Sequence, residues 1–149
     1  MSKIMSCTIK INTQAEKILT ELQSIGFSKQ NVSILFPDRA DTKKWVQEKH
    51  AGGVLEWLAG IGSLAIPGIG PFIAAGPILA ALSGSVLGAA MGGVTAALVG
   101  LKMSEYEAKI YERKIKEGLI LISVHIQDVG IGKRKQALII FKNADASEI

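Results

Sequence analysis

A run of 45 residues without a charged side chain, from Trp57 to Leu101, constrains this chain more than any other feature. The run is about twice the ~20 apolar residues that one membrane-spanning helix requires, so it has to be buried in a membrane or against protein. Proline and glycine interrupt helices, because proline lacks a backbone donor and glycine is conformationally free. We therefore expect an apolar helical hairpin over residues 52-101, with its turn at Pro67, Gly68, Gly70 and Pro71.

The two arms of the predicted hairpin differ in length. Trp57–Ile66 provides ten uncharged positions, whereas Ile78–Leu101 provides 24. Only the second arm is long enough to span a bilayer, so two crossings and a re-entrant insertion are both open. A third interpretation is a buried helical pair within a soluble fold, because helices that are apolar on all sides occur in both settings.

Small residues recur every four positions along the second arm. In a helix they share one side, and bulky residues such as Ile78, Leu82 and Leu98 occupy another. Small-residue ladders let helix backbones approach closely, which in a membrane drives helix association. Each interior glycine disfavours a helix by about 1 kcal/mol relative to alanine, so packing has to compensate. The predicted assembly residues are Ala80, Gly84, Gly88, Gly92, Ala96 and Gly100.

The segment before the hairpin, residues 6-37, has the pattern strand, helix, strand. Cys7, Ile9 and Ile11 alternate with polar residues, as in a half-buried strand. Thr13 with Glu16 predicts a capping box for the following helix, and Gly26 is a typical helix stop. A second alternation of apolar residues ends at Pro37.

The segment after the hairpin, residues 104-149, has the pattern helix, strand, helix. Ser104 with Glu107 predicts a capping box, and Gly118 a stop. The continuous aliphatic run Leu119–Ile126 indicates a central strand covered on both faces. Together the two segments predict a single α+β domain over residues 1-149, a small ferredoxin-like open sheet with helices that the hairpin interrupts.

Charge and cysteine content limit the classes of partner, the disulfides and the location that we expect for the chain. The 17 basic and 13 acidic residues are interleaved, and aromatic residues do not alternate with lysines, so we expect no nucleic-acid partner despite the net charge of +4. Cys7 is the sole cysteine, which excludes an internal disulfide. Both flanks of the hairpin are basic, which favours the cytoplasmic side of the inner membrane and permits contact with anionic headgroups.

Motifs that would indicate catalysis are lacking. His50 and His125 have no partner at ligand or catalytic spacing, so we predict no catalytic, metal or cofactor site. The sequence Gly130-Ile131-Gly132-Lys133 is not a phosphate loop, because Gln127 replaces the required first glycine and no Ser or Thr follows the lysine. These observations favour a non-enzymatic protein.

Four stretches resemble a known family. They are Leu64–Pro71, Ala74–Pro77, Ser104–Tyr111 and Glu117–His125. The combination resembles the bacterial heat-induced general stress protein domain, with similarity from about Ser6 through Val124. The resemblance implies a small stress-associated protein without an assigned reaction. The chain departs from the pattern near its end, where the acidic stretch is reduced to Asp128.

Three functions follow as hypotheses. The first is a membrane-associated stress protein that self-assembles into a homo-oligomer through the hairpin. The second is a soluble, cytoplasmic homo-oligomer with a shared hairpin core, whose α/β headpiece binds a small molecule or a partner. The third is a pore, for which only Ser83, Ser85 and Thr95 offer a polar lining.

Overall fold

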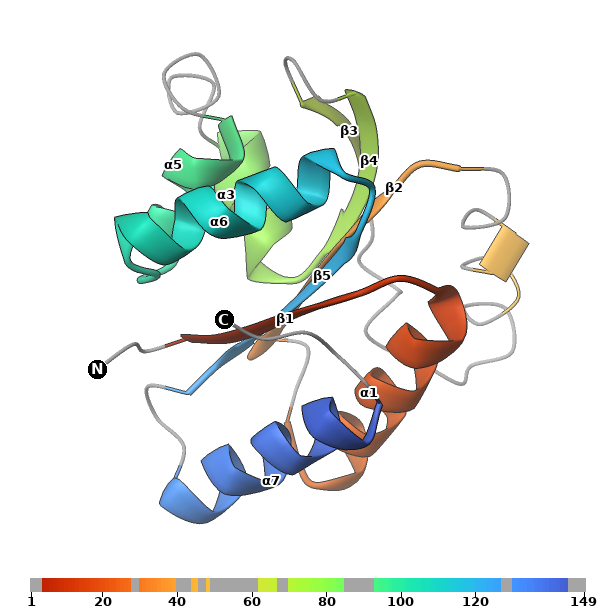
Figure 1. Ribbon diagram of the computed structural model, residues 1–149, viewed down its shortest axis with the longest axis vertical. Helices are drawn as coiled ribbons and strands as arrows, with labels where there is room; N and C mark the ends of the chain where they lie inside the picture. The colour runs from red at the N-terminus through yellow and green to blue at the C-terminus, as the bar shows by residue number, and fades with distance from the viewer. Residues whose placement is uncertain are drawn as a thin grey trace.

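The computed structural model of the chain describes residues 4–27, 30–39, 44–45, 48, 62–66, 70–84, 93–126 and 130–144. Within these residues five strands and five helices follow one another along the chain (Figure 1). They are β1 (Ile4–Ile9), α1 (Asn12–Ser24), β2 (Val32–Pro37), β3 (Gly62–Ile66), β4 (Gly70–Ala75), α3 (Pro77–Gly84), α5 (Gly93–Gly100), α6 (Glu105–Lys116), β5 (Ile120–His125) and α7 (Ile131–Asn143).

The strands form one open sheet in the order β1-β5-β2-β4-β3, and every pair of neighbours is antiparallel. β1 and β2 consequently run parallel to each other with β5 between them, which makes β1-α1-β2 a split β-α-β unit. Helices cover both faces of the sheet: α1 and α7 lie on one face, and α3, α5 and α6 on the other (Figure 1). The predicted open α+β sheet is confirmed.

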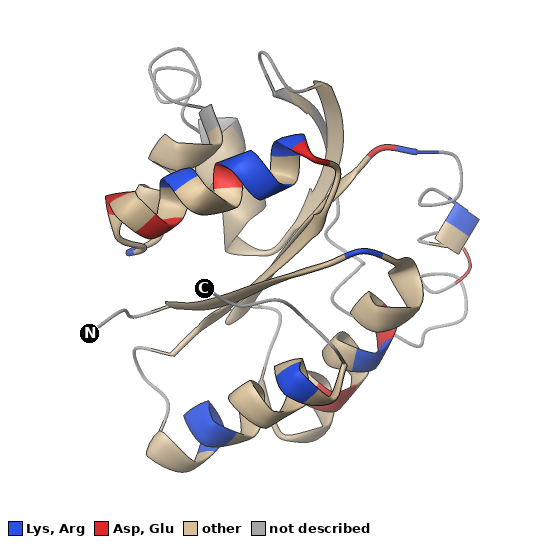
Figure 2. Cartoon of the chain, viewed as in Figure 1, with Lys and Arg blue, Asp and Glu red and all other residues tan. Residues whose placement is uncertain are grey.

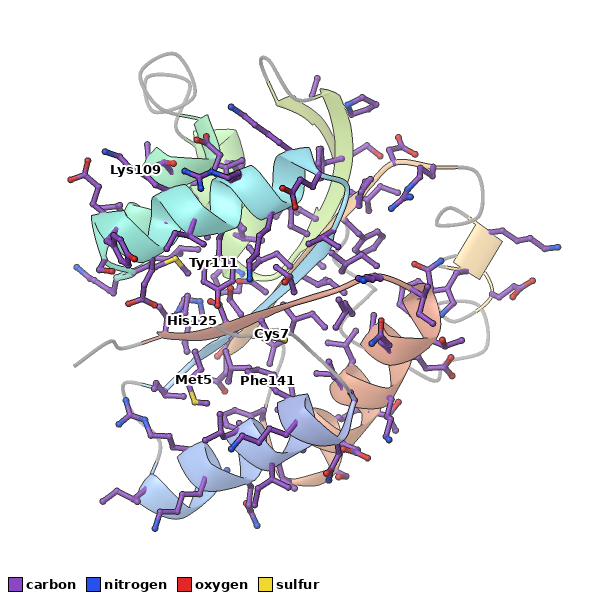
Figure 3. All side chains as sticks on the ribbon, viewed as in Figure 1. Met5, Cys7, Lys109, Tyr111, His125 and Phe141 are labelled. Atoms are coloured by element: carbon purple, nitrogen blue, oxygen red, sulfur yellow. The ribbon has the colours of Figure 1, made fainter. Side chains whose placement is uncertain are left out.

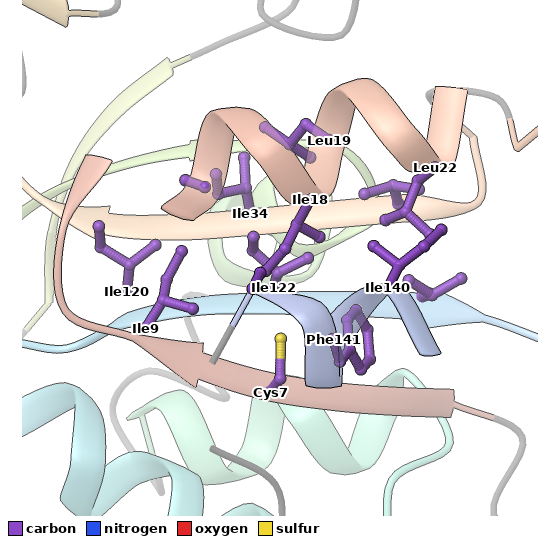
Figure 4. Packing of buried hydrophobic residues seen from close by; sticks show 14 of the residues in the cluster. Cys7, Ile9, Ile18, Leu19, Leu22, Ile34, Ile120, Ile122, Ile140 and Phe141 are labelled. Atoms are coloured by element: carbon purple, nitrogen blue, oxygen red, sulfur yellow. The ribbon is translucent and has the colours of Figure 1, made fainter. Parts of the chain in front are cut away.

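The face of the sheet toward α1 and α7 is apolar at its centre, with aliphatic and aromatic side chains and the thiol of Cys7. Ile18 and Leu22 of α1 and Phe141 of α7 pack on it (Figure 4). Because side chains alternate across a strand, every second strand residue contributes to this face. The strand residues in this core are Cys7, Ile9, Val32, Ile34, Phe36, Ile73, Ala75, Ile120, Ile122 and Val124.

β5 is the central strand that the aliphatic run predicted. It pairs with β1 on one side and with β2 on the other, and its residues from Ile120 to Val124 are buried. Alternate side chains of β5 enter the two cores, with Ile122 toward α1 and Leu121 toward α6. A strand covered on both faces has no polar side to present to solvent, which explains why its sequence lacks alternation.

The predicted first helical arm, Trp57–Ile66, is wrong over Gly62–Ile66, which forms the strand β3, while residues 57–61 lie outside the described residues. Gly70–Ala75, after the predicted turn, is the strand β4. β4 pairs with β2, from Ile34 opposite Ala75 to Pro37 opposite Phe72, and β3 extends the sheet beyond it. A continuous apolar run has no period that separates a buried strand from a buried helix. The strand conformation is favoured here because pairing with β4 satisfies the backbone N–H and C=O groups along the edge of β2.

The predicted second arm is not one straight helix. Its described residues form two helices, α3 and α5, which pack against each other. In one continuous helix, segments centred 16 residues apart would lie about 24 Å from each other, so two helices in contact are not parts of one straight helix. Among the residues described, no helix combines the length and apolar character needed to cross a membrane.

Helix ends show one correct and one wrong prediction. Ser104 caps α6, because its Oγ accepts the backbone N–H of Glu107 at 3.2 Å and donates to the Glu107 carboxylate at 3.0 Å. The predicted Thr13–Glu16 box does not form, since the N-cap of α1 is Ile11, two residues before Thr13, and the helix begins at Asn12. There Gln14 Oε1 accepts the backbone N–H groups of Lys10 and Ile11 at 3.0 and 3.2 Å.

Candidate functional site

The described small residues of the predicted ladder lie on the sides of α3 and α5 that face away from the sheet. Ala80 and Gly100 are exposed, and Ala96 is half-buried. A Cβ placed on Gly100 would meet no atom within 4 Å. Gly84 is the last residue of α3, and Gly88 and Gly92 lie outside the described residues.

The bulky residues of the same helices point the opposite way. Ile78, Leu82, Val94 and Leu98 are buried against the sheet. Each helix therefore packs its bulky side chains against the sheet. Ala80, Ala96 and Gly100 are together called here the small-residue face, of which the described part of the chain covers Ala96 only partly and leaves Ala80 and Gly100 exposed.

The predicted hairpin turn joins strands. Gly70 is the first residue of β4, opposite Ile66, and has a positive φ of 122° that favours glycine. Pro71 follows it in β4, opposite Ala65. Pro67 and Gly68 lie outside the described residues.

A row of three serines crosses the sheet beneath α3 and α6. Ser6 of β1 lies opposite Ser123 of β5, and Ser123 lies opposite Ser33 of β2. The Oγ atoms of Ser6 and Ser123 are 2.8 Å apart and share a hydrogen bond. The row was not predicted from the sequence, although each serine interrupts an apolar strand, because only the strand register brings the three together.

Ser33 connects the row to α3. Its Oγ accepts the backbone N–H of Ile78 at 3.0 Å, so a residue of the sheet caps the first turn of this helix. Gly76, immediately before α3, has a φ of 86°, and a Cβ there would lie 2.0 Å from the carbonyl oxygen of Val32. This close approach brings the start of α3 within hydrogen-bonding distance of Ser33.

Tyr111 connects the other end of the row to α6. Its ring is buried, and its hydroxyl donates a 2.7 Å hydrogen bond to the backbone carbonyl of Ser6 (Figure 3). Lys114 lies over the same ring, with its Nζ 5.7 Å from the centroid. The serine row thus fixes two helices of this layer to the sheet through directed hydrogen bonds.

His125 ends β5 on the same face as Ser123. Burial lowers the pKa of its imidazole, which favours the neutral form. Its Nε2 is buried and makes no hydrogen bond to the described residues. Thr8 of β1 lies opposite Leu121, and its Oγ1 is likewise buried without a hydrogen bond to the described residues.

No group of three or more residues with metal-binding side chains occurs within the described residues. Cys7 is buried in the core toward α1. Searches for related family models, curated proteins and solved structures found no match to this chain. The resemblance to the general stress protein domain therefore stays a prediction that rests on its sequence motifs.

Proposed function

We propose that this protein is a non-enzymatic, stress-associated protein that self-assembles at a membrane through the small-residue face of α3 and α5. The observation that carries the proposal is the orientation of these helices. Their bulky sides are buried against the sheet, while Ala80 and Gly100 are exposed and Ala96 is half-buried. Small side chains at helical spacing let a helix of a second copy approach closely.

The split β-α-β unit supports the finer fold assignment. β1, α1 and β2 enclose β5, and α1 and α7 share one face of the sheet, as expected for a ferredoxin-like headpiece. In the proposed assembly this headpiece carries the small-residue face on the side opposite α1 and α7.

A second candidate is a soluble homo-oligomer whose α/β headpiece binds a ligand or partner. It is favoured by the burial of Ile78, Leu82, Val94 and Leu98 against the protein's own sheet, which leaves these side chains no lipid to contact. Both candidates use the same assembly face and differ in whether a membrane is involved.

The test measures the mass of the full chain by light scattering and its distribution by membrane fractionation. Both measurements are made with and without detergent. We expect an assembly well above the 15.8 kDa of one chain, recovered with the membrane fraction. An assembly that stays soluble without detergent supports the second candidate. A monomer under both conditions contradicts self-assembly.

Gly100→Leu tests the face itself. The position is open, so leucine fits within one chain but blocks the approach of a second helix. We expect the mass to fall toward that of one chain without a loss of folding by circular dichroism. Gln136→Leu is the matched control, because it adds the same side chain to an exposed helix position in the other layer. An unchanged mass for Gly100→Leu would argue against this face.

A further inference from the structure

α7 presents a mixed apolar and basic surface to solvent. Its buried side consists of Ala137, Ile140 and Phe141. The opposite side carries Ile131 and Ile139, which are 73% and 55% exposed, although isoleucine is usually buried. Steps of four, four and three residues place these two side chains and two exposed lysines on one side of the helix. The outward face of α7 is Ile131, Lys135, Ile139 and Lys142.

The charge of α7 is of one sign. The helix carries four cations and no carboxylate, and Figure 2 shows Lys and Arg along it without Asp or Glu. Lys133 is turned toward the protein, with its Nζ 5.7 Å from the centroid of the Phe27 ring. Lys135 and Lys142 are exposed and point outward.

The helix packed beside α7 does not cancel this charge. α1 contributes Glu16 and Glu21, which are both half-buried. It also contributes Lys17, which is exposed and whose Nζ donates to the backbone carbonyl of Asn143 at 3.1 Å. Lys17 therefore adds a cation beside the last turn of α7.

We propose that the outward face of α7 is a docking surface for an anionic lipid bilayer. Lysines near such a surface are attracted to acidic headgroups, and their aliphatic stems tolerate burial while the ammonium groups stay in water. Isoleucines between them can enter the boundary between headgroups and acyl chains, as in interfacial helices. A nucleic acid would use the lysines but has no apolar layer to receive the two isoleucines, so the combined surface fits lipid better.

This inference rests on the proposed membrane association and assigns it to a particular surface. α7 lies on the face of the sheet opposite α3, α5 and α6. Docking through α7 therefore leaves the small-residue face directed away from the bilayer, where a second copy can reach it. Membrane binding then belongs to the layer of α7 and self-assembly to the layer of α3 and α5, so that a mutation can remove one without the other.

The experiment is co-sedimentation of the full chain with phosphatidylcholine vesicles, with and without about 30% phosphatidylglycerol, at low and high salt. We expect binding that requires the anionic lipid and weakens with salt. K135Q/K142Q should lower the partition coefficient about thirtyfold, since each lysine near an anionic surface contributes about 1 kcal/mol. I131S/I139S should lower it at both salt concentrations, because the apolar contribution is not screened.

K109Q/K116Q is the matched control. It removes the same charge from exposed positions of α6, in the layer opposite α7, and should change the partition coefficient less than twofold. Equal losses in both lysine variants, or full binding by I131S/I139S, would overturn the docking surface. Binding to a single-stranded oligonucleotide that competes with the vesicles and survives I131S/I139S would also overturn it.

The mass measurement separates this inference from the proposed self-assembly. K135Q/K142Q should release the protein from vesicles while its oligomer mass in solution stays unchanged. Gly100→Leu should reduce the mass without abolishing binding to anionic vesicles. Binding to pure phosphatidylcholine that no α7 variant affects would overturn docking through α7 and leave membrane association standing. Failure to bind any vesicle would contradict both.

Discussion

The two faces of the sheet are built differently, and β5 shows the contrast within two residues. Ile122 and Ser123 are both fully buried, but Ile122 enters the core toward α1 and α7, whereas Ser123 lies in the serine row toward α3 and α6. On the first face the helices are held by apolar contact. On the second face hydrogen bonds from Ser33 and Tyr111 also fix the helices in place.

The two layers also differ in the groups that accept hydrogen bonds at the starts of their helices. α1 satisfies its start locally, through Gln14, two residues into the helix. α3 obtains an acceptor from Ser33, 45 residues earlier in the chain. The α3 layer therefore depends on correct pairing of the sheet for its own hydrogen bonds.

Gly76→Ala should have the largest effect on stability. The new Cβ would lie 2.0 Å from the Val32 carbonyl oxygen, at a φ of 86°, so β2 and the start of α3 would have to separate. We expect a loss of about 3 kcal/mol or more in the free energy of unfolding, measured by urea denaturation. Gly118→Ala is the control: its φ is 92° but no atom lies within 4 Å, so a loss of about 1–2 kcal/mol is expected. Equal losses would show that the close approach does not matter.

Ile122→Ala should be the next largest change, because it tests the apolar face alone. The side chain is fully buried in the core toward α1, and truncating such a residue costs about 2–5 kcal/mol in unfolding free energy. Chemical denaturation measures it. The neighbouring Ser123→Ala, on the other face, should cost about 1 kcal/mol, because one hydrogen bond is lost and little volume changes. A larger loss for Ser123→Ala than for Ile122→Ala would contradict the view that apolar contact on the face toward α1 contributes more to stability than the serine row.

Ser33→Ala should lower the free energy of unfolding by about 1–2 kcal/mol. It leaves the backbone N–H of Ile78 buried without its acceptor. Hydrogen exchange should show faster opening of α3 than of α1, because only α3 takes its cap from the sheet. Ser24→Ala, which removes an exposed hydroxyl bonded to the Glu21 carbonyl, should stay within about 0.5 kcal/mol. Uniform acceleration in both helices would contradict a local role.

Ser6→Ala and Ser123→Ala form a double-mutant cycle across β1 and β5. Each single change leaves one hydroxyl without its 2.8 Å partner, whereas the double change removes both. We expect a coupling free energy of about 0.5–1.5 kcal/mol, with the double variant more stable than additivity predicts. Additive losses would mean that the two hydroxyl groups contribute independently.

The pH dependence of stability should show the smallest effect. Burial lowers the pKa of His125 below that in the unfolded chain, about 6.5, so the neutral imidazole contributes stability above that pH. This contribution is lost as the pH falls through the lowered value, because protonation favours the unfolded chain. Unfolding free energies between pH 7.5 and 5 should fall more steeply for the wild type than for His125→Gln. Parallel curves would rule out His125 as the cause.

Local signals in the sequence determined the outer thirds of this protein. The β1-α1-β2 order, the Ser104 cap and the central strand β5 were all predicted, because alternation, capping residues and apolar runs act within a few neighbouring residues. The stops at Gly26 and Gly118 were also predicted, and both glycines have positive φ. These features need no knowledge of distant parts of the chain.

The strands in the middle of the chain and the serine row depend on contacts between segments that are distant in the sequence. The part of the uncharged run from Gly62 to Ala75 carries no period, so the strands β3 and β4 became visible only through the pairing of β4 with β2 and of β3 with β4. Ser6, Ser33 and Ser123 are far apart in the sequence and meet only through strand register, which a one-residue shift would destroy. Most of the large apolar side chains described in the uncharged run, such as Phe72, Ile78 and Leu98, are buried, as its composition indicated. Residues 72–75 are buried in a strand because the edge of β2 offers backbone groups with which they can pair.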